Sequence, residues 1–228
     1  MENELTDLRI KSAGFQRGFV SFVLLIIACA CSPRQPAQSF TVGALLREVR
    51  FESATDWEAY QDAALGVAGA VRGGTYRIDI ADGGFMWALH DQVETDVVIE
   101  AETQQLSAYR NTAYGVMCRA SPSANGNGYY FFISADGYYS IRRGAGREVL
   151  DLIPFTFSER VRQGTDFNRI RAVCVGDYLA LFANGFLLGE VRDGLYHSGT
   201  AGLTAAVPDG GDVSVEFDNV LIFTAQPG

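Results

Sequence analysis

Residues 167–191 read FNRIRAVCVGDYLALFANGFLLGEV, and this stretch decides the fold. Three short runs, rich in aliphatic, β-branched and aromatic side chains, are separated by the dipeptides Gly176-Asp177 and Asn184-Gly185. Both dipeptides readily adopt the positive φ angles that two-residue hairpin turns require. Each run is too short for a typical helix of a globular protein, so the stretch predicts three successive antiparallel strands.

The same pattern continues outward in both directions, from residue 47 to the end of the chain. Residues 128–143 read GYYFFISADGYYSIRR, in which a two-residue turn at Asp136-Gly137 would pair Phe132 with Ile141. Residues 56–70 are the one helical candidate, and two glycines weaken it. About eleven short strands joined by tight turns predict an all-β fold, a two-sheet antiparallel jelly-roll sandwich.

Length and charge narrow the range of possible partners. The 228 residues suffice for one large domain, and the formal net charge is −9. An acidic protein repels phosphate groups, so the sequence argues against nucleic acid as a partner. The two histidines, His90 and His197, lie far apart, and the sequence has no Cys-x-x-Cys motif, so a metal centre is not indicated.

The N-terminal part of the chain has the pattern of an export signal. Residues 18–32, GFVSFVLLIIACACS, form an uncharged apolar run that follows Arg9, Lys11 and Arg17. The run is shorter than the roughly 20 residues that a membrane-spanning helix needs, so it predicts the apolar region of a signal peptide. Three acidic residues upstream of the run are atypical of such a signal.

The end of this run, Ile26-Ile27-Ala28-Cys29, resembles the bacterial lipobox, in which the cysteine receives a lipid. That resemblance implies removal of residues 1–28, lipidation of Cys29, and an extracytoplasmic domain anchored to the bacterial cell membrane. Residues 29–40, which include two prolines and several polar side chains, are then a flexible tether, and 41–228 form the β-sandwich domain. The alternative is a signal peptide cut elsewhere, with two incidental cysteines.

The two remaining cysteines, Cys118 and Cys174, lie in predicted strands. A turn at Gly176-Asp177 pairs Cys174 with Leu179 and places Cys174 on the core face. In an exported domain such a pair predicts a disulfide, which would stabilise the fold by on the order of 4 kcal/mol. Two buried free thiols are the alternative.

Several further stretches resemble one family. They are VRGGTYRI (71–78), TDVVIEAE (95–102), YGVMCRA (114–120), SGTAGLTAA (198–206) and VEFDNVLIF (215–223), in addition to the two quoted above. Together they resemble exported bacterial domains of the concanavalin A-like lectin/glucanase superfamily, especially its laminin G-like and keto-glycoside-hydrolase-like jelly rolls. That superfamily includes lectins, glycosidases and adhesion modules, so the resemblance implies the fold and leaves the function open.

Family-16 glycoside hydrolases of this superfamily carry a Glu-x-Asp-x-Glu strand whose alternate carboxylates share one face. The nearest match here is DVVIEAE (96–102), where Asp96, Glu100 and Glu102 share a face. Val98 occupies the central position, so the residue that would orient the nucleophile is missing. A solvated charged strand face explains the three acids better, no catalytic residue is assigned, and the sequence favours a protein that is not an enzyme.

Aromatic residues are the feature with most bearing on function. A two-residue turn at Asp136-Gly137 places Phe131, Tyr138 and Arg142 on the outer side of their hairpin, and Trp87 lies in a loop-like context. Exposed rings beside charged groups suit stacking on sugars, although alternating aromatics also fill sandwich cores. These four residues are therefore the candidate ligand-binding residues.

No cofactor is predicted. Calcium is conceivable, because acidic turns in such sandwiches often hold it, and Asp177, Asp209 and Asp212 could supply oxygen ligands. Turn aspartates that bond their own backbone are the better explanation.

These observations predict a non-catalytic, membrane-anchored module outside the cytoplasm that binds a glycan or an envelope protein through one face. Two alternatives remain open. A glycoside hydrolase related to the keto-disaccharide hydrolases would need a deep groove with two converging carboxylates. A structural subunit of an envelope complex would need a large apolar face.

Overall fold

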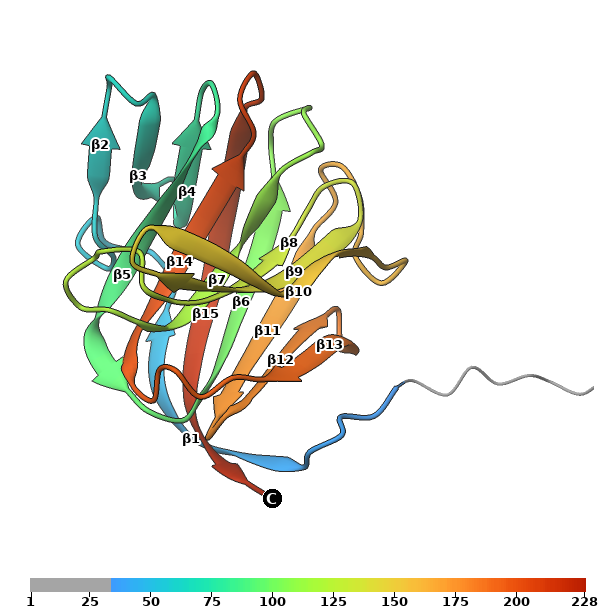
Figure 1. Ribbon diagram of the computed structural model, residues 1–228. Coiled ribbons are helices and arrows are strands. Elements are labelled where there is room, and N and C mark those ends of the chain that lie inside the picture. The colour runs from blue at the N-terminus through green and yellow to red at the C-terminus, as the bar shows by residue number, and fades with distance from the viewer. Residues whose placement is uncertain (1–33) are drawn as a thin grey trace, which may run out of the picture. The chain divides into compact units, whose positions relative to one another are not determined.

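The computed structural model describes residues 34–228, which contain fifteen strands and no helix (Figure 1). The strands form two antiparallel sheets, one of nine strands and one of six. The predicted all-β jelly-roll sandwich is confirmed, with more strands than the roughly eleven expected. Residues 56–70, the one helical candidate, contribute β2 and part of β3 instead.

The nine-stranded sheet is built around β15, whose fifteen residues pair with three other strands. β15 pairs with β6 along one edge, and with β4 and then β1 along the other. The strand order is β13 (Phe186–Arg192), β12 (Tyr178–Ala183), β11 (Asn168–Val175), β6 (Val97–Gln105), β15 (Val213–Pro227), β4 (Thr75–Ile80), β3 (Val67–Arg72) and β2 (Tyr60–Asp62), with β1 (Phe40–Val49) on β15.

The six-stranded sheet packs against the first sheet and carries the site described below. Its strand order is β10 (Glu148–Phe157), β9 (Tyr138–Ala145), β8 (Gly128–Ile133), β7 (Ala113–Ala120), β14 (Gly199–Val207) and β5 (Gly84–Glu94). β10 and β5 are the edges. The pairing of β10 with β9 shifts register twice, which lets β10 bend away from a regular ladder.

The core lies between the two sheets and is filled by every second residue of most strands. Large buried rings such as Tyr76, Tyr114, Phe131 and Phe217 belong to it. The predicted disulfide between Cys118 and Cys174 is confirmed: it joins β7 to β11, and therefore one sheet to the other, across 56 residues of sequence.

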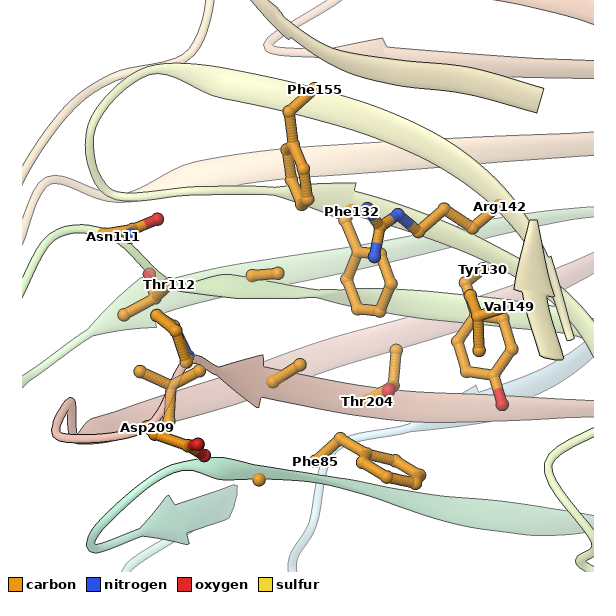
Figure 2. Close-up of a pocket in the computed structure, with 15 residues that line it drawn as sticks. Phe85, Asn111, Thr112, Tyr130, Phe132, Arg142, Val149, Phe155, Thr204 and Asp209 are labelled. Atoms are coloured by element: carbon orange, nitrogen blue, oxygen red, sulfur yellow. The ribbon is translucent and has the colours of Figure 1, made fainter. Parts of the chain in front are cut away.

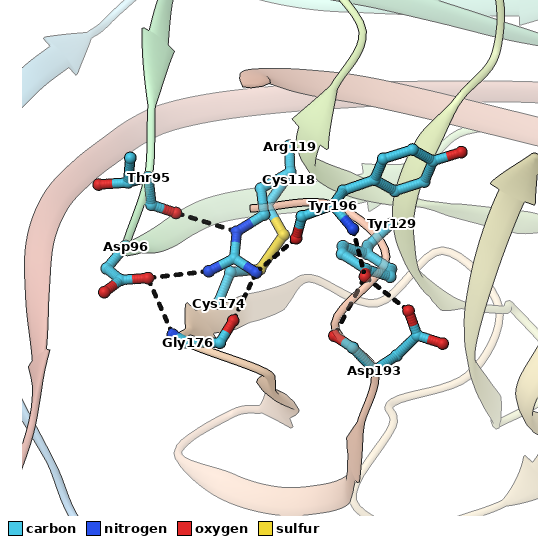
Figure 3. Close-up of a disulfide and its surroundings, with 9 residues drawn as sticks. All are labelled: Thr95, Asp96, Cys118, Arg119, Tyr129, Cys174, Gly176, Asp193 and Tyr196. Atoms are coloured by element: carbon cyan, nitrogen blue, oxygen red, sulfur yellow. Dashed lines mark hydrogen bonds and ion pairs between the residues drawn. A yellow bond between two sulfur atoms is a disulfide. The ribbon is translucent and has the colours of Figure 1, made fainter. Parts of the chain in front are cut away.

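Beside the disulfide, Arg119 is a buried cation that links both sheets (Figure 3). Its guanidinium donates hydrogen bonds to Asp96 Oδ1 at 2.8 Å and to the carbonyl oxygens of Thr95, Gly176 and Tyr196 at 2.7–3.0 Å. Burial lowers the pKa of Arg119, and the Asp96 carboxylate opposes that effect. Because these bonds reach backbone from several strand ends, Arg119 fixes one end of the sandwich.

The two hairpins used for the sequence predictions gave different outcomes. The turn at Gly176-Asp177 has two residues, and the predicted pairing of Cys174 with Leu179 is confirmed. The turn at Asp136-Gly137 is longer than predicted. Ser134 N donates to Tyr138 O at 2.9 Å, which leaves a three-residue loop, so Phe132 pairs with Ser140 instead of Ile141. A shift of one residue exchanges the two faces of a strand.

The chain that leads into β1 lies along the nine-stranded sheet. Arg34 Nη2 and Ala37 N donate to the Glu190 carboxylate at 3.1 and 2.7 Å, and Gln38 accepts a bond from Arg192. We call residues 34–39 the strap. The predicted signal peptide (1–28) and Cys29 lie outside the described residues, as does the first part of the predicted tether. Within residues 34–228 no helix has the length and apolarity to cross a membrane.

Candidate functional site

The outward face of the six-stranded sheet, which points away from the other sheet, carries an apolar cluster of its own. Tyr130 and Phe132 of β8 lie on it next to Met117 and Ala113 of β7, and Trp87 of β5 packs against them. An outward sheet face is normally polar in a protein that is solvated on that side. The cluster itself is buried, and the exposed rings of Phe85 and Phe155 beside it form a surface that a ligand or partner can contact.

A groove of about 500 Å³ runs over this cluster (Figure 2). We call it the aromatic groove; its walls include Phe85, Tyr130, Phe132, Arg142, Phe155 and Asp209. Phe85 follows Gly83 and Gly84, whose positive φ angles turn the chain into β5. Phe155 comes from the bent edge strand β10 and points into the groove from the opposite wall, as Figure 2 shows.

The rings of the groove are held by their neighbours. Tyr130 and Phe132 stack with centroids 5.7 Å apart, and Phe85 stacks on Trp87 at 5.3 Å. The Tyr130 hydroxyl donates to Gly126 O at 2.6 Å, and burial raises the pKa of Tyr130 to about 12. The hydroxyl therefore stays protonated at neutral pH and the ring keeps a fixed orientation.

Two charged side chains, those of Arg142 and Asp209, line the groove. The guanidinium of Arg142 lies 4.8 Å from the centroid of the Phe155 ring, and its Nε is 2.7 Å from Asp151 Oδ1. Among the lining residues Arg142 is the one base and Asp209 the one carboxylate. Acid–base cleavage of a glycosidic bond by the usual route needs two carboxyl groups that face each other across the bond, and the groove lining supplies one.

The structure separates the four residues predicted to bind ligand. Arg142 lines the aromatic groove, and Trp87 lines an adjoining pocket. Tyr138 is on the outward face, as predicted, but lies outside the groove and packs edge-on against Phe157, with ring centroids 5.6 Å apart. The placement of Phe131 was wrong: it is fully buried in the core, because the longer turn moves Phe132 to the outward face in its place.

Three groove residues were missed by the sequence analysis. Phe132 was assigned to the wrong face for the reason just given. Phe155 lies in a strand that was not recognised, although VLDLIPF (149–155) has several alternating apolar residues. Phe85 follows a Gly-Gly pair and was left without an assignment; nothing local in the sequence shows that it faces β8 across the sheet.

The acidic strand 96–102 lies elsewhere, on the outward face of the nine-stranded sheet. Glu100 pairs with Arg171 and Glu102 with Arg169, both from the neighbouring strand β11, and Glu102 also accepts a bond from Asn219. Asp96 is engaged by Arg119. The Glu100 and Glu102 carboxylates point away from the aromatic groove, since the two sheets lie between them and it.

The three aspartates considered for calcium do not form one cluster. Asp177 pairs with Arg192 at the turn between β11 and β12, whereas Asp209 lines the aromatic groove. No group of three or more His, Cys, Asp or Glu side chains within residues 34–228 is arranged to hold a metal ion.

No protein-family model matches the chain, and no curated protein matches it. Solved structures do match. The carbohydrate-binding module CBM66 from Bacillus subtilis is 16% identical with a TM-score of 0.58, over 74% of this chain and 95% of that one. A galectin-like protein of unknown function, also from Bacillus subtilis, is 13% identical with a TM-score of 0.58, over 82% and 99%.

A third similar structure is the κ-carrageenase of Pseudoalteromonas carrageenovora, solved with an oligotetrasaccharide of κ-carrageenan. It is 12% identical with a TM-score of 0.55, over 84% of this chain and 97% of that one. At such identities the likeness concerns the fold alone. These neighbours include both a binding module and an enzyme on one β-sandwich fold, so the function has to be argued from the groove.

Proposed function

We propose that this protein is a non-catalytic glycan-binding module and that the aromatic groove is its binding site. The observation that carries the proposal is the set of aromatic rings on an outward sheet face, where solvent would otherwise favour polar side chains. The carbohydrate-binding and glycan-active neighbours of the same fold support it.

The chemistry of the groove suits a sugar. A pyranose ring has one face of C–H groups that stacks on an aromatic ring, and hydroxyls around its rim that seek hydrogen bonds. Phe85 and Phe155 are exposed by 63% and 38% and supply rings on opposite walls. Asn111, Arg142 and Asp209 lie around those rings and offer amide, guanidinium and carboxylate partners for hydroxyls.

The proposal of a non-catalytic role rests on the carboxylates. Within the aromatic groove, Asp209 has no second carboxylate opposite it. Glu58 and Asp82, which line the adjoining pocket, each accept a backbone N–H. Glu100 and Glu102 are on the other sheet, each paired with an arginine. Groups arranged in this way can bind a glycan but do not provide the acid and the nucleophile or base that hydrolysis requires.

Membrane anchoring through Cys29 is a further part of the proposal. A module displayed outside the cytoplasm on a lipid would meet cell-envelope or environmental glycans, which suits an aromatic groove. An envelope protein is the alternative partner, and it would occupy the same apolar face.

A glycan-array screen of the purified protein tests the proposal, followed by titration calorimetry on the sugars retained. Phe155→Ala should weaken binding by about 2- to 12-fold, because one stacked ring contributes about 0.5–1.5 kcal/mol. Phe157→Ala is the matched control, since Phe157 is an exposed aromatic of the same strand outside the groove.

Two results would overturn the proposal. One is equal loss of binding in Phe155→Ala and Phe157→Ala, which would place the ligand elsewhere. The other is turnover of a glycoside that Asp209→Asn abolishes, which would make the protein an enzyme. Membrane-fraction mass spectrometry tests the anchor separately, and an unmodified Cys29 or an intact Met1 would contradict it.

A further inference from the structure

A second pocket of about 600 Å³ lies directly beside the aromatic groove. We call it the side pocket; its walls include Glu58, Tyr60, Leu65, Asp82 and Trp87. Tyr60 and Leu65 come from β2 and the turn that follows it, and Trp87 comes from β5. The β2–β3 hairpin belongs to the nine-stranded sheet, so the side pocket lies where the edges of the two sheets meet.

The two pockets share part of their walls. Gly84, Phe85 and Asp209 line both of them, so no intervening strand separates one from the other. Phe85 is the side chain at the boundary: it is 63% exposed, and it stacks on Trp87 with nearly parallel rings, 19° apart. A ligand that leaves the aromatic groove past Phe85 therefore meets a second ring at once.

The side pocket differs from the groove in charge. Three carboxylates line it, those of Glu58, Asp82 and Asp209, and its lining includes no Arg, Lys or His. Asp82 Oδ1 accepts the backbone N–H of Gly210 at 3.1 Å, and a Glu58 oxygen accepts that of Leu89 at 3.3 Å. These hydrogen bonds hold the two carboxylates in place. They repel an anionic ligand and can accept hydrogen bonds from sugar hydroxyls.

We infer that the two pockets form one continuous groove for an extended, uncharged oligosaccharide, with sugar units on both sides of Phe85. The inference rests on the proposed function and names its ligand class: a neutral chain of several sugars, in contrast to a monosaccharide or an acidic glycan. Each pocket has the size, roughly 300–1,000 Å³, that usually accommodates a small ligand, so each holds at least one sugar unit.

The experiment measures binding of the full-length protein to length series, from monosaccharide to hexasaccharide, of gluco-, manno-, galacto- and fructo-oligosaccharides, with oligogalacturonates as anionic probes. Tyr60→Ala removes an exposed ring that lines the side pocket alone. We expect it to weaken binding of the longer chains by about 2- to 12-fold and to leave the shortest retained sugar unchanged. Phe155→Ala should weaken both.

The charge part of the inference has its own variant. Asp82→Asn keeps an oxygen that can accept the Gly210 N–H and removes the charge. We expect Asp82→Asn to improve binding of the oligogalacturonates relative to the neutral chain of equal length.

The outcomes separate the two proposals. The inference is wrong, and the proposed function stands, if affinity depends on Phe155 but not on chain length or on Tyr60. The same holds if oligogalacturonates bind the unchanged protein as well as neutral chains do. If no probe binds, or if binding does not depend on Phe155, the proposed function fails and the inference fails with it.

Discussion

Both outward faces of the sandwich carry an apolar cluster, but the exposed groups around the two clusters differ. On the nine-stranded sheet, charged groups are paired within the protein: Glu100 with Arg171, Glu102 with Arg169, and Glu190 with Arg34. On the six-stranded sheet the outward positions of β8 carry Tyr130 and Phe132, and exposed rings face them from both edges of the groove.

This difference indicates on which face side chains remain available to contact a ligand. An arginine that already bonds a carboxylate gains little from a ligand, because a new bond must replace an existing one. An exposed ring has no such partner, and covering it removes apolar surface from water. The charged groups of the nine-stranded sheet are thus paired within the protein, whereas Phe85 and Phe155 of the six-stranded sheet remain exposed and available for binding.

A large effect should come from the disulfide that links the two sheets. Replacing both Cys118 and Cys174 by serine should lower the free energy of unfolding by about 2–5 kcal/mol, because the unfolded chain gains freedom when the bridge is lost. Urea unfolding of the double variant and of the unchanged protein, without reductant, checks this. Equal midpoints would mean that packing alone holds the two sheets together.

Two adjacent rings on opposite faces of β8 sharpen the comparison. Phe131→Ala should cost about 3–5 kcal/mol of stability, because Phe131 is fully buried in the core. Phe132→Ala should cost less, since Phe132 belongs to the smaller cluster on the outward face, and it should also weaken glycan binding because Phe132 lines the aromatic groove. Thermal unfolding measures the stability of the two variants, and calorimetry measures their glycan binding. Equal losses of stability, with no loss of binding by Phe132→Ala, would show that the two rings have the same role.

A third prediction concerns the strap. Burial opposes ionisation of Glu190, but bonds from Ala37 N–H, the Tyr178 hydroxyl and Arg34 outweigh it and lower the pKa of Glu190. A lowered carboxyl pKa contributes stability above the ordinary value of about 4.3, and that contribution is lost as pH falls through the lowered pKa. Glu190→Gln should therefore destabilise the protein by about 1–3 kcal/mol at neutral pH. The difference should shrink in unfolding experiments below about pH 4; a difference that grows on acidification would contradict the assigned direction.

The smallest effect is expected for the charged pairs of β6. Glu100→Gln and Glu102→Gln should change stability by about 0–1 kcal/mol, because their arginine partners are substantially exposed and solvent screens the attraction. Neither variant should alter glycan binding. Unfolding curves at low and high salt check the first point, since the small loss should fade as salt screens the pairs.

The sequence predicted the fold because its signals were local and repeated. The pairing of Cys174 with Leu179 followed from one dipeptide, Gly176-Asp177, and the disulfide followed from the face that this pairing implies. At Asp136-Gly137 the dipeptide was equally clear, yet Ser134 and Tyr138 close a loop that is one residue longer. A dipeptide indicates a turn without fixing the loop length, and the length determines which of Phe131 and Phe132 faces outward.

The site was harder to predict because it is assembled from distant strands. Arg142 and Trp87 were identified, yet they line two different pockets. Phe85 and Phe155 lie on opposite edge strands, some seventy residues apart, and meet across the groove only through the order of the sheet. That order depends on long-range pairing, which alternation within a strand does not specify.

The strap has a consequence for where the chain enters the domain. Residues 34–39 lead into β1 along the nine-stranded sheet, where hydrogen bonds with Glu190 and Arg192 hold them (Figure 1). The described chain therefore enters the domain along the sheet whose charged groups are paired. The aromatic groove opens from the opposite sheet, so the strap and the groove lie on different faces of the sandwich.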